Sequence, residues 1–362
     1  MTTELADRIR GCLLGLAVGD ALGVPVETMT HEEIMAATNG QGIVGYSKPL
    51  QKKVRDTGNL PPGSTSDDTQ LTRVTLRSLV QSGGFNLRDQ ANCLVDEFET
   101  TTFGWGGTTR VAAQELKDWR DSGGTRGRAP EIHAPCPPNS NKRGCGSGVA
   151  MRIAPLAIHH LLRYELDERD RCKGFSADAM SLGLLTHADP RASIAAIALG
   201  HTVSLLTSDY LRDSERTIGL DYFRIMIWNR IIYEVRQAEA TYRHFRPEQP
   251  LFSSRLKDAL SLRFDSVALR QQINTGFSAM QSVPFAIATA LRHPNDFRTA
   301  VLEGVNAGQD TDTVGSMVGA IVGARVGIKG IPEKWLMDLH GAGSMFHAAD
   351  SLLYAMRHPP EF

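Results

Sequence analysis

The chain has 362 residues, 41% of them hydrophobic, and a formal net charge of −1 at pH 7. This length allows one large domain or two ordinary ones with a substantial core, and the balanced charge excludes the basic footprint of a sequence-independent nucleic-acid binder. The five cysteines form no C-x-x-C pair, which is typical of a reduced protein rather than of a disulfide framework.

Helical periodicity runs through almost the whole chain, and stretches of alternating β-branched residues are nearly absent. The pattern therefore predicts an all-α protein and not a βαβ fold. No internal repeat or low-complexity linker marks a boundary, so we expect a single domain over 1–362. Long irregular stretches are expected at about 122–146, 208–220 and 243–252. The predicted helices are 3–22, 67–82, 87–100, 107–121, 147–164, 176–186, 190–207, 221–238, 253–263, 278–291, 295–306, 311–326 and 333–356.

Two segments are apolar enough to compare with targeting or membrane elements. The apolar run near the N-terminus is interrupted by Asp20 and preceded by Glu4 and Asp7, which does not fit a signal peptide. The run 314–324 is too short to cross a bilayer and is followed by Arg325. We therefore expect a cytoplasmic protein without a membrane partner.

Two of the predicted helices carry a ridge of glycines spaced four residues apart. Each glycine inside a helix costs up to about 1 kcal/mol relative to alanine, so two such ridges need a compensating reason. Positions four apart lie on one helix face, where bare glycines allow two helices to approach closely. We expect the two ridges to pack against each other, antiparallel. They are Gly11, Gly15, Gly19 and Gly23, and Gly315, Gly319, Gly323 and Gly327.

Two acidic clusters lie far apart in the chain, each at the start of a predicted helix. Each cluster alone is explained by helix capping, because Ser and Asp favour helix N-termini. If the clusters meet, however, four crowded carboxylates demand cations or protonation. Hard cations such as Mg²⁺ prefer oxygen ligands, so the clusters together predict a site for two divalent cations. The clusters are Ser66-Asp67-Asp68-Thr69 and Asp310-Thr311-Asp312-Thr313.

A further carboxylate follows the first helix, which Pro25 is expected to end. Glu27 then lies in a loop, where it could be aimed at a site or could be an ordinary exposed side chain. Asp20 lies on an otherwise apolar helix face, and a buried aspartate needs polar partners.

Three other motifs could contact a ligand. A glycine pair opens a helix, where it could form an anion cradle or only a flexible turn. A second glycine loop could approach a phosphate or ribose. A histidine stands at a junction between two helices, where a structural histidine is the simpler alternative. The three motifs are Gly106, Gly107 and Thr108; Gly146, Ser147 and Gly148; and His187.

In this order, these motifs resemble the ADP-ribosylglycohydrolase family. The late stretch from Asn306 to Gly315 is highly specific, and the segment from Glu27 to Ile34 is most similar to the bacterial arginine-type branch. The resemblance implies a compact single-domain orthogonal helix bundle of the ADP-ribosylglycohydrolase type. It spans nearly the whole chain, and the matching stretches are 11–27, 66–69, 106–110, 146–155, 186–190 and 306–327.

The resemblance also implies a dinuclear Mg²⁺ or Mn²⁺ centre and assigns roles by matching position. Asp312 would bridge the two cations. Glu27, Asp67 and Asp310 would be the carboxylates that assist the reaction. One cation would be held by Ser66, Asp67, Asp68 and Asp312, and the other by Asp310, Asp312 and Thr313. The diphosphate would meet Gly106, Gly107 and Thr108, and the ribose and adenosine half would meet Gly146, Ser147, Gly148 and His187.

The expected function is hydrolysis of the glycosidic bond between ADP-ribose and a protein side chain, with arginine favoured. Water activated between two cations would attack the anomeric carbon, and a carboxylate would take its proton. The partner is then an ADP-ribosylated protein. The alternative is an immunity-type protein that binds and occludes an ADP-ribosyltransferase toxin, with contacts from the loop 122–146 or the N-terminal arm. An inactive reader of ADP-ribose is disfavoured because the ligand set is complete.

Overall fold

The computed structural model describes residues 2–50, 60–132, 144–163, 168–208, 218–242 and 250–358. In these residues every regular element is a helix, and isolated bridges join Thr30 to Gly308 and Gly146 to Ser278. The predicted all-α class is confirmed. Parts of the predicted irregular stretches 122–146, 208–220 and 243–252 lie outside the described residues, namely 133–143, 209–217 and 243–249.

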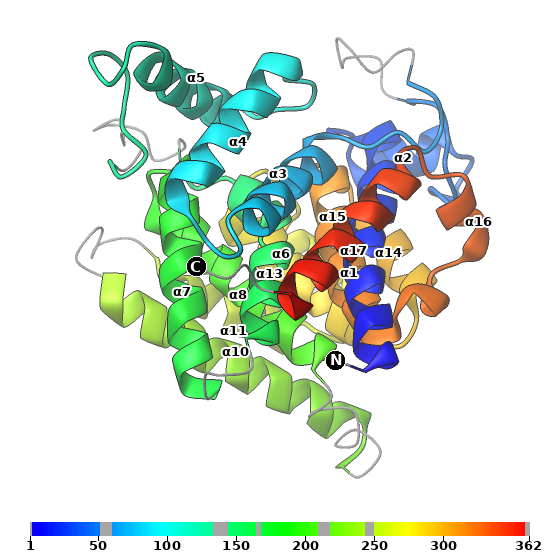
Figure 1. The fold of residues 1–362 in the computed structure, drawn as a ribbon. Helices are drawn as coiled ribbons and strands as arrows, with labels where there is room; N and C mark the ends of the chain where they lie inside the picture. Colours follow the sequence, from blue (N-terminus) through cyan, green and yellow to red (C-terminus); the bar gives the residue numbers. More distant parts are fainter. Residues whose placement is uncertain are drawn as a thin grey trace.

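Figure 1 shows the helices coloured in chain order from blue at the N-terminus to red at the C-terminus. The first half contains α1 (Thr3–Gly23), the 3-10 turn η1 (Val24–Val26), α2 (His31–Ala37), α3 (Asp67–Gln81), α4 (Leu87–Thr100), α5 (Gly107–Asp121), the 3-10 segment η2 (Ser147–Arg152), α6 (Ala154–Leu162) and α7 (Glu168–Leu184). The second half contains α8 (Pro190–Thr207), α10 (Leu220–Tyr242), α11 (Phe252–Ser261), α12 (Ser266–Gln272), α13 (Ala279–Arg292), α14 (Phe297–Val305), α15 (Thr311–Val326), η5 (Ile328–Gly330), α16 (Glu333–Met337) and α17 (Ala342–Arg357).

Several predicted helices need correction. The predicted helix 147–164 is divided into η2 and α6, and the predicted helix 333–356 is divided into α16 and α17 by a turn that ends at Gly341, which adopts φ +79°. The predicted helix 176–186 instead runs from Glu168 to Leu184. The short helices α2 and α12 are not among the predicted ones. α2 carries a capping box between Thr30 and Glu33, a start signal that the sequence already shows.

The two glycine ridges pack against each other, as predicted, and bring α1 and α15 together in antiparallel orientation. A Cβ atom placed on Gly15 would lie 2.4 Å from the carbonyl oxygen of Gly319, and one on Gly19 would lie 2.0 Å from that of Gly315. Backbone therefore touches backbone along the pair, which leaves no room for a side chain.

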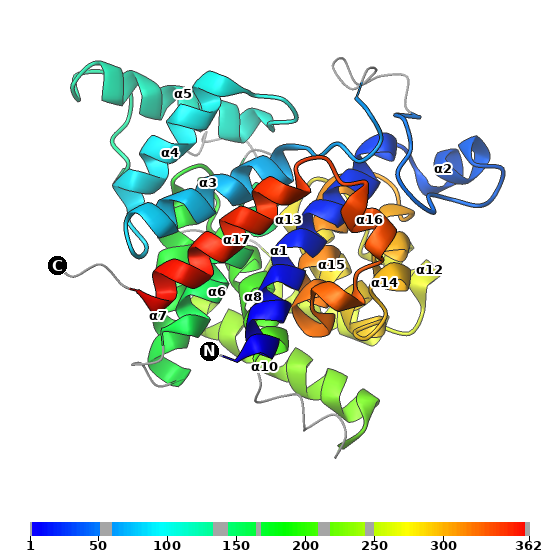
Figure 2. The same ribbon diagram turned by 45° about the vertical axis from the view of Figure 1, so that its right-hand side comes forward.

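A large apolar core surrounds this pair and joins helices from both ends of the chain, from Leu5 in α1 to Leu353 in α17. Figure 2 shows α17 running alongside α1. The stretch from Thr3 to Val26 is the one helical segment of the described residues that is long and apolar enough to cross a membrane, but 94% of its apolar window is buried inside the fold. Packing in the core thus accounts for its hydrophobicity.

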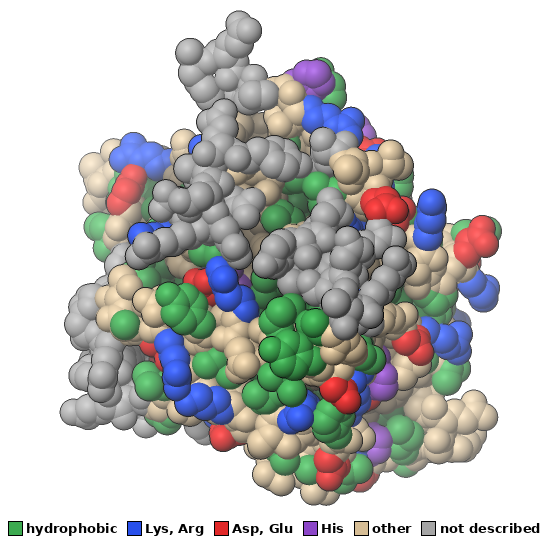
Figure 3. All heavy atoms as spheres, turned by 90° about the horizontal axis from the view of Figure 1, so that it is seen from below, with side chains coloured by type: hydrophobic (Ala, Val, Ile, Leu, Met, Phe, Trp, Pro, Cys, Tyr) green, Lys and Arg blue, Asp and Glu red, His purple; other side chains and the backbone are tan. Residues whose placement is uncertain are grey.

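The surface carries charges of both signs. On the face seen in Figure 3, Lys and Arg side chains are scattered among acidic and hydrophobic ones rather than gathered in one basic patch. This mixture agrees with the nearly neutral net charge of the chain.

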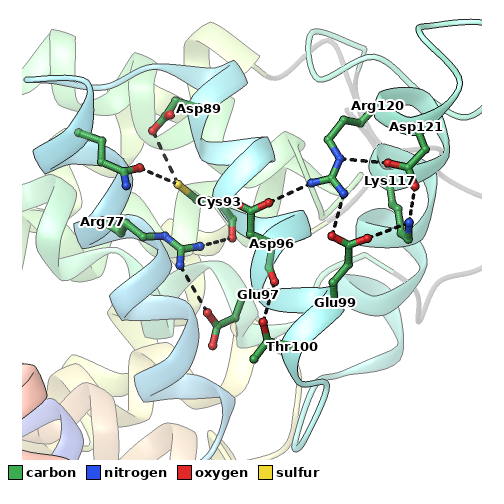
Figure 4. A network of polar contacts seen from close by, with 11 residues as sticks. Arg77, Asp89, Cys93, Asp96, Glu97, Glu99, Thr100, Lys117, Arg120 and Asp121 are labelled. Atoms are coloured by element: carbon green, nitrogen blue, oxygen red, sulfur yellow. Dashed lines mark hydrogen bonds and ion pairs between the residues drawn. The ribbon is translucent and has the colours of Figure 1, made fainter.

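α4 and α5 form an outer pair that packs near α3 through a smaller apolar cluster, which includes Leu94 of α4 and Leu116 of α5. Charged side chains join the pair at its surface, where Arg120 of α5 binds Asp96 and Glu99 of α4 at 3.0 and 2.8 Å (Figure 4). Such exposed ion pairs contribute little stability each, so the apolar cluster is the main link between the two helices.

Candidate metal centre

Asp20 holds the start of α3, where the first acidic cluster lies. Its carboxylate is fully buried and accepts hydrogen bonds from the backbone N–H of Ser66 at 2.9 Å and of Thr69 at 3.1 Å. The hydroxyl of Thr69 donates to the same carboxylate at 2.5 Å. Protein donors therefore occupy both carboxylate oxygens of Asp20, so this residue holds the first acidic cluster in place through hydrogen bonds.

The two acidic clusters meet in space, as the predicted site requires. The hydroxyl of Thr313 lies 3.3 Å from a carboxylate oxygen of Asp68, and the hydroxyl of Ser316 donates to the other oxygen. Ser66 caps α3 by accepting from the N–H of Asp68. Asp310 makes no side-chain capping bond to α15, so helix capping does not explain its carboxylate.

Glu27 and Asp310 stand on two backbone segments that are locked together. The N–H of Thr28 donates to the carbonyl of Gln309 at 2.7 Å, and the N–H of Gln309 donates to the carbonyl of Met29 at 2.6 Å. Thr28 and Gln309 adopt the left-handed backbone, with φ +70° and +64°. Such strained non-glycine residues persist only where their surroundings hold them, and they cluster at functional sites. Here they flank two candidate ligands.

Asp312 is the electrostatic centre of the group. Burial raises the pKa of Asp20 to about 7 and of Asp310 to about 8, and in both cases the charge of Asp312 is the second cause. For Glu27, which is only half-buried, the charge of Asp312 is the largest of several causes, burial among them, that together raise the pKa to about 9. Burial and then Asp312 also raise the pKa values of the two aspartates at the start of α3. Crowded carboxylates of this kind resist ionisation unless positive charge joins them.

These residues fit a divalent cation. Carboxylate oxygens of Glu27, Asp310 and Asp312 lie within 4.8 Å of one another, and two of the three residues are buried. Such a set of hard oxygen donors matches Mg²⁺ or Mn²⁺. Arg152 is a buried cation near the group; burial lowers its pKa to about 10, and the charge of Asp67 opposes this. One guanidinium does not balance the crowded carboxylates, so the chemistry of the donor set calls for additional positive charge.

The turn before α5 lies against the first cluster. A Cβ atom on Gly104, which adopts φ +79°, would lie 2.8 Å from a carboxylate oxygen of Asp67. The indole N–H of Trp105 donates to the side-chain oxygen of Gln70 in α3 at 3.1 Å. These two contacts fix the position of the turn relative to the acidic centre.

The residues after this turn are exposed to solvent or partly so. Gly106 and Gly107 are exposed, and a Cβ atom on either would meet nothing within 4 Å. Thr108, in the first turn of α5, is half-exposed. The N-terminus of α5 therefore stands uncovered at the edge of the site.

The loop that contains Ser147 lies on the other side. Ser147 is buried, and its hydroxyl donates to Asp310 at 3.0 Å, so its side chain supports the acidic centre directly. Its backbone N–H donates to the carbonyl of Phe277, a residue that is 52% exposed. His187 is buried beneath this loop, and a Cβ atom on Gly148 would lie 3.1 Å from its ring.

The predicted site residues are thus gathered around one centre, and three further residues join them. The sequence indicated Asp20 as a buried aspartate, but not what it holds. Ser316 lies one turn after Asp312 and resembles any serine in a helix, so only the packing of α15 near α3 identifies it. Phe277 carries no sequence signal beyond its apolar side chain.

Comparison with known proteins decides the family. The family model described as ADP-ribosylglycohydrolase matches residues 1–361. The chain belongs to the ADP-ribosylglycohydrolase family. It is 25% identical over 359 residues to the ADP-ribosylhydrolase ARH3 of Mus musculus, with 92% of this chain and 88% of that protein covered. It is also 25% identical over 339 residues to the ADP-ribosyl-[dinitrogen reductase] glycohydrolase of Rhodospirillum rubrum, with 92% and 90% covered.

A solved structure shares the fold of this family member. It is an ADP-ribosylglycohydrolase-related protein complex, with a TM-score of 0.61, 24% sequence identity and coverage of 98% of this chain and 100% of that chain. The relatives agree with the resemblance that the motifs indicate, and the chain is accordingly an enzyme of the ADP-ribosylglycohydrolase type.

A second group of potential metal ligands lies away from this centre in the described residues. Cys172, His201 and Glu234 place ligand atoms within 4.8 Å of one another. Arg230, however, donates to Glu234 at 2.9 Å and lies 3.7 Å from the sulfur of Cys172. The guanidinium already supplies positive charge there, which distinguishes this group from the ADP-ribosylglycohydrolase centre.

Without divalent cations, the protein is expected to lose stability as the pH rises. The folded pKa values of Asp20, Asp310 and Glu27, about 7, 8 and 9, exceed the ordinary carboxyl value of about 4. Between these pH values the folded state therefore binds more protons than the unfolded state. This stabilisation is fully present below a pH of about 4 and is lost as the pH passes through the folded values. Thermal unfolding in EDTA at several pH values measures the decline.

Saturating Mg²⁺ or Mn²⁺ should reverse this pH dependence, because metal binding favours the deprotonated carboxylates. A melting temperature in EDTA that stays constant or rises between pH values of about 5 and 9 would contradict the crowding of charge described above.

Proposed function

We propose that this enzyme is a metal-dependent hydrolase that releases ADP-ribose from a modified protein side chain and so reverses mono-ADP-ribosylation. The observation that carries the proposal is the convergence of both acidic clusters and Glu27 around the buried Asp312. Two Mg²⁺ or Mn²⁺ ions are proposed to bind there. One would be held by Ser66, Asp67, Asp68 and Asp312, and the other by Asp310, Asp312 and Thr313.

The cations, when bound, supply Lewis acidity and lower the pKa of water. The residues of the chain supply position and proton transfer. Glu27 is the least buried of these carboxylates and is therefore the proposed acceptor of the proton that the attacking water releases. Added positive charge would lower its pKa from about 9 and return it to the carboxylate form. Asp67 and Asp310 flank the same space and are the other candidates for this role.

The remaining ligand contacts are proposed from the shape of the site. The open N-terminus of α5 presents backbone N–H groups that suit the diphosphate. The loop of Ser147, together with His187, is proposed to meet the ribose and adenosine half. Ser147 would act there through Asp310, to which its hydroxyl is bound. The residues of the two contacts are Gly106, Gly107 and Thr108, and Gly146, Ser147, Gly148 and His187.

Arginine is the acceptor that the charge of the site favours. The four aspartates of the two clusters, with Asp20 and Glu27, outweigh two divalent cations and the buried guanidinium of Arg152, so the loaded centre keeps negative charge. A guanidinium group is a permanent cation that carboxylates bind well, whereas the oxygen of a serine side chain carries no positive charge. The two relatives named above are both 25% identical to this chain, so sequence identity does not favour one of them as the guide to its acceptor.

Side-by-side incubation with arginine-linked and serine-linked ADP-ribosyl peptides tests the proposal. We expect free ADP-ribose, detected by chromatography, from the arginine-linked peptide with Mg²⁺ or Mn²⁺ and none after EDTA treatment. Release from the serine-linked peptide alone would overturn the arginine assignment but keep the hydrolase. Undiminished release in EDTA would overturn the metal dependence.

The immunity-type alternative stays a prediction. Of its proposed contact, the loop 122–146, residues 133–143 lie outside the described residues. Neutralisation of an ADP-ribosyltransferase toxin by an Asp312→Asn variant would support it, since occlusion does not require the carboxylate. The single domain over 1–362 and the cytoplasmic location of the enzyme and its substrate likewise remain proposals.

A further inference from the structure

A chain of hydrogen bonds leads from a buried arginine to His187. An Arg152 guanidinium nitrogen donates to the hydroxyl oxygen of Thr186 at 2.8 Å, and this oxygen lies 2.9 Å from Nδ1 of His187. All three side chains are buried, with exposed fractions of 1 to 3%. Water therefore does not compete for these bonds, and a proton between these side chains that found no partner would be energetically costly.

The direction of the protons follows from the donors available. A guanidinium only donates, so the Thr186 oxygen must accept from Arg152. The single hydroxyl proton of Thr186 is then free to donate, and Nδ1 of His187 is its one acceptor among the described residues. If Nδ1 carried the proton instead, the buried hydroxyl proton would be left without a partner, which typically costs about 1–3 kcal/mol. Nδ1 therefore accepts, and the neutral ring carries its proton on Nε2.

The ring is also kept neutral. Burial lowers the pKa of His187 to about 3, and the charge of Arg152 contributes to this lowering. Arg152 keeps its own proton at neutral pH, because its pKa of about 10 is still well above 7. The hydrogen bonds from Arg152 through Thr186 to His187, here called the relay, thus start at a permanent donor and end at a neutral imidazole.

Two glycines lie against the Nε2 edge of the ring. Cβ atoms placed on Gly146 and Gly148 would lie 3.4 and 3.3 Å from Nε2. A Cβ atom on Gly148 would also lie 3.6 Å from the hydroxyl of Thr109, in the first turn of α5. The space beside Nε2, here called the Nε2 corner, therefore lies between the loop that supports Asp310 and the open start of α5. Hydrogen bonds of the His187 ring within the described residues involve Nδ1 alone.

We propose that Arg152 and Thr186 are positioning residues that hold His187 in the Nε2–H tautomer, so that Nε2–H donates a hydrogen bond to an acceptor oxygen of the bound ADP-ribose. The inference rests on the proposed function for the identity of the ligand, but the tautomer itself does not. A locked donor selects ligands that present a hydroxyl or phosphate oxygen at this corner, because a group that can only donate would meet the Nε2 proton.

Nuclear magnetic resonance of the full chain labelled with ¹⁵N-histidine tests the tautomer directly, with neither ligand nor turnover. The chain has 11 histidines, so the signals of His187 are assigned by their loss in a His187→Gln variant. We expect a protonated Nε2 and an unprotonated Nδ1 in the wild type. In Thr186→Val the shifts should move toward the average of both tautomers, while Thr186→Ser should keep the wild-type shifts because it keeps the hydroxyl.

ADP-ribose affinity, measured by calorimetry on metal-loaded protein, tests the consequence. Thr186→Val should weaken binding about three- to tenfold, the value of one neutral hydrogen bond, and Thr186→Ser should restore it. Gly148→Ala should also weaken binding, because its Cβ atom covers Nε2, while the tautomer stays unchanged. If Thr186→Val does not fold, Arg152→Met tests the same relay from its other end.

Two results would overturn the proposal. One is a wild-type His187 with its proton on Nδ1, and the other is unchanged affinity in both Thr186→Val and Gly148→Ala. Neither result bears on whether the acidic centre hydrolyses a glycosidic bond. Conversely, failure of ADP-ribose release with a correct tautomer would contradict the proposed function and leave the relay intact.

Discussion

Replacing Asp312 with asparagine is expected to reduce the release of ADP-ribose by at least about a thousandfold, because each tenfold corresponds to about 1.36 kcal/mol and a bound cation supplies several. Asp312 is the proposed ligand that both cations share. It contributes to the raised pKa values of five surrounding carboxylates, and its oxygens lie within 4.8 Å of those of Glu27 and Asp310. Single-turnover release of ADP-ribose from a modified peptide measures the loss.

The fold of this variant is expected to survive, which separates loss of chemistry from loss of structure. Removing one of several crowded carboxylates relieves repulsion, so the melting temperature in EDTA should stay level or rise, whereas stabilisation by Mg²⁺ should shrink. Asp221→Asn is the matched control, because that side chain is 75% exposed at a surface ion pair. Near-wild-type turnover in Asp312→Asn would disprove the proposed centre.

The second large effect is expected from Gly319→Ala, which should destabilise the protein by about 3 kcal/mol or more, at or beyond the usual cost of overpacking a core. The new Cβ atom would lie 2.0 Å from the carbonyl oxygen of Gly15 and 2.7 Å from its carbonyl carbon. Backbone cannot rotate away as a side chain can, so α1 and α15 must separate. Because these helices carry Asp20 and Asp312, metal affinity should fall together with stability. Urea unfolding and a Mg²⁺ titration measure the two effects.

Gly343→Ala is the matched control for this substitution. Gly343 lies in α17 and is exposed, and a Cβ atom there would meet nothing within 4 Å. The same chemical change should therefore stabilise the protein by up to about 1 kcal/mol through helix propensity alone. Equal effects of the two substitutions on the unfolding free energy would show that the ridge is not closely packed.

Most long helices were predictable because their apolar residues recur with the helical period and their ends carry ordinary signals. Pro25 lies in the turn that follows α1, Ser66 caps α3, and Pro155 in the first turn of α6 marks where that helix separates from η2. Boundaries that depend on local backbone geometry are harder to predict. The division before α17 requires the left-handed φ of Gly341, and a helix as short as α12 offers too few turns for a period to show.

Which residues gather at the candidate site was predictable from the sequence, but the contacts that hold them in place were not. Paired aspartates beside hydroxyls indicate a metal centre before any fold is known. Ser147 was expected to lie in the loop that meets the ribose and adenosine half, but the hydrogen bond from its hydroxyl to Asp310 was not expected. Ser316 and the backbone strain at Thr28 and Gln309 were not expected, because they depend on which segments become neighbours.

Periodicity and side-chain chemistry are local properties, so the helical class, the glycine faces that pack together and the carboxylates available to a cation all follow from the order of residues alone. Three further facts required the folded chain: Asp20 is a support rather than an open ligand, the two clusters share one buried space, and Arg152 reaches His187 through Thr186. The physical reason is that burial, repulsion between charges and the direction of a hydrogen bond depend on distances between residues far apart in the chain.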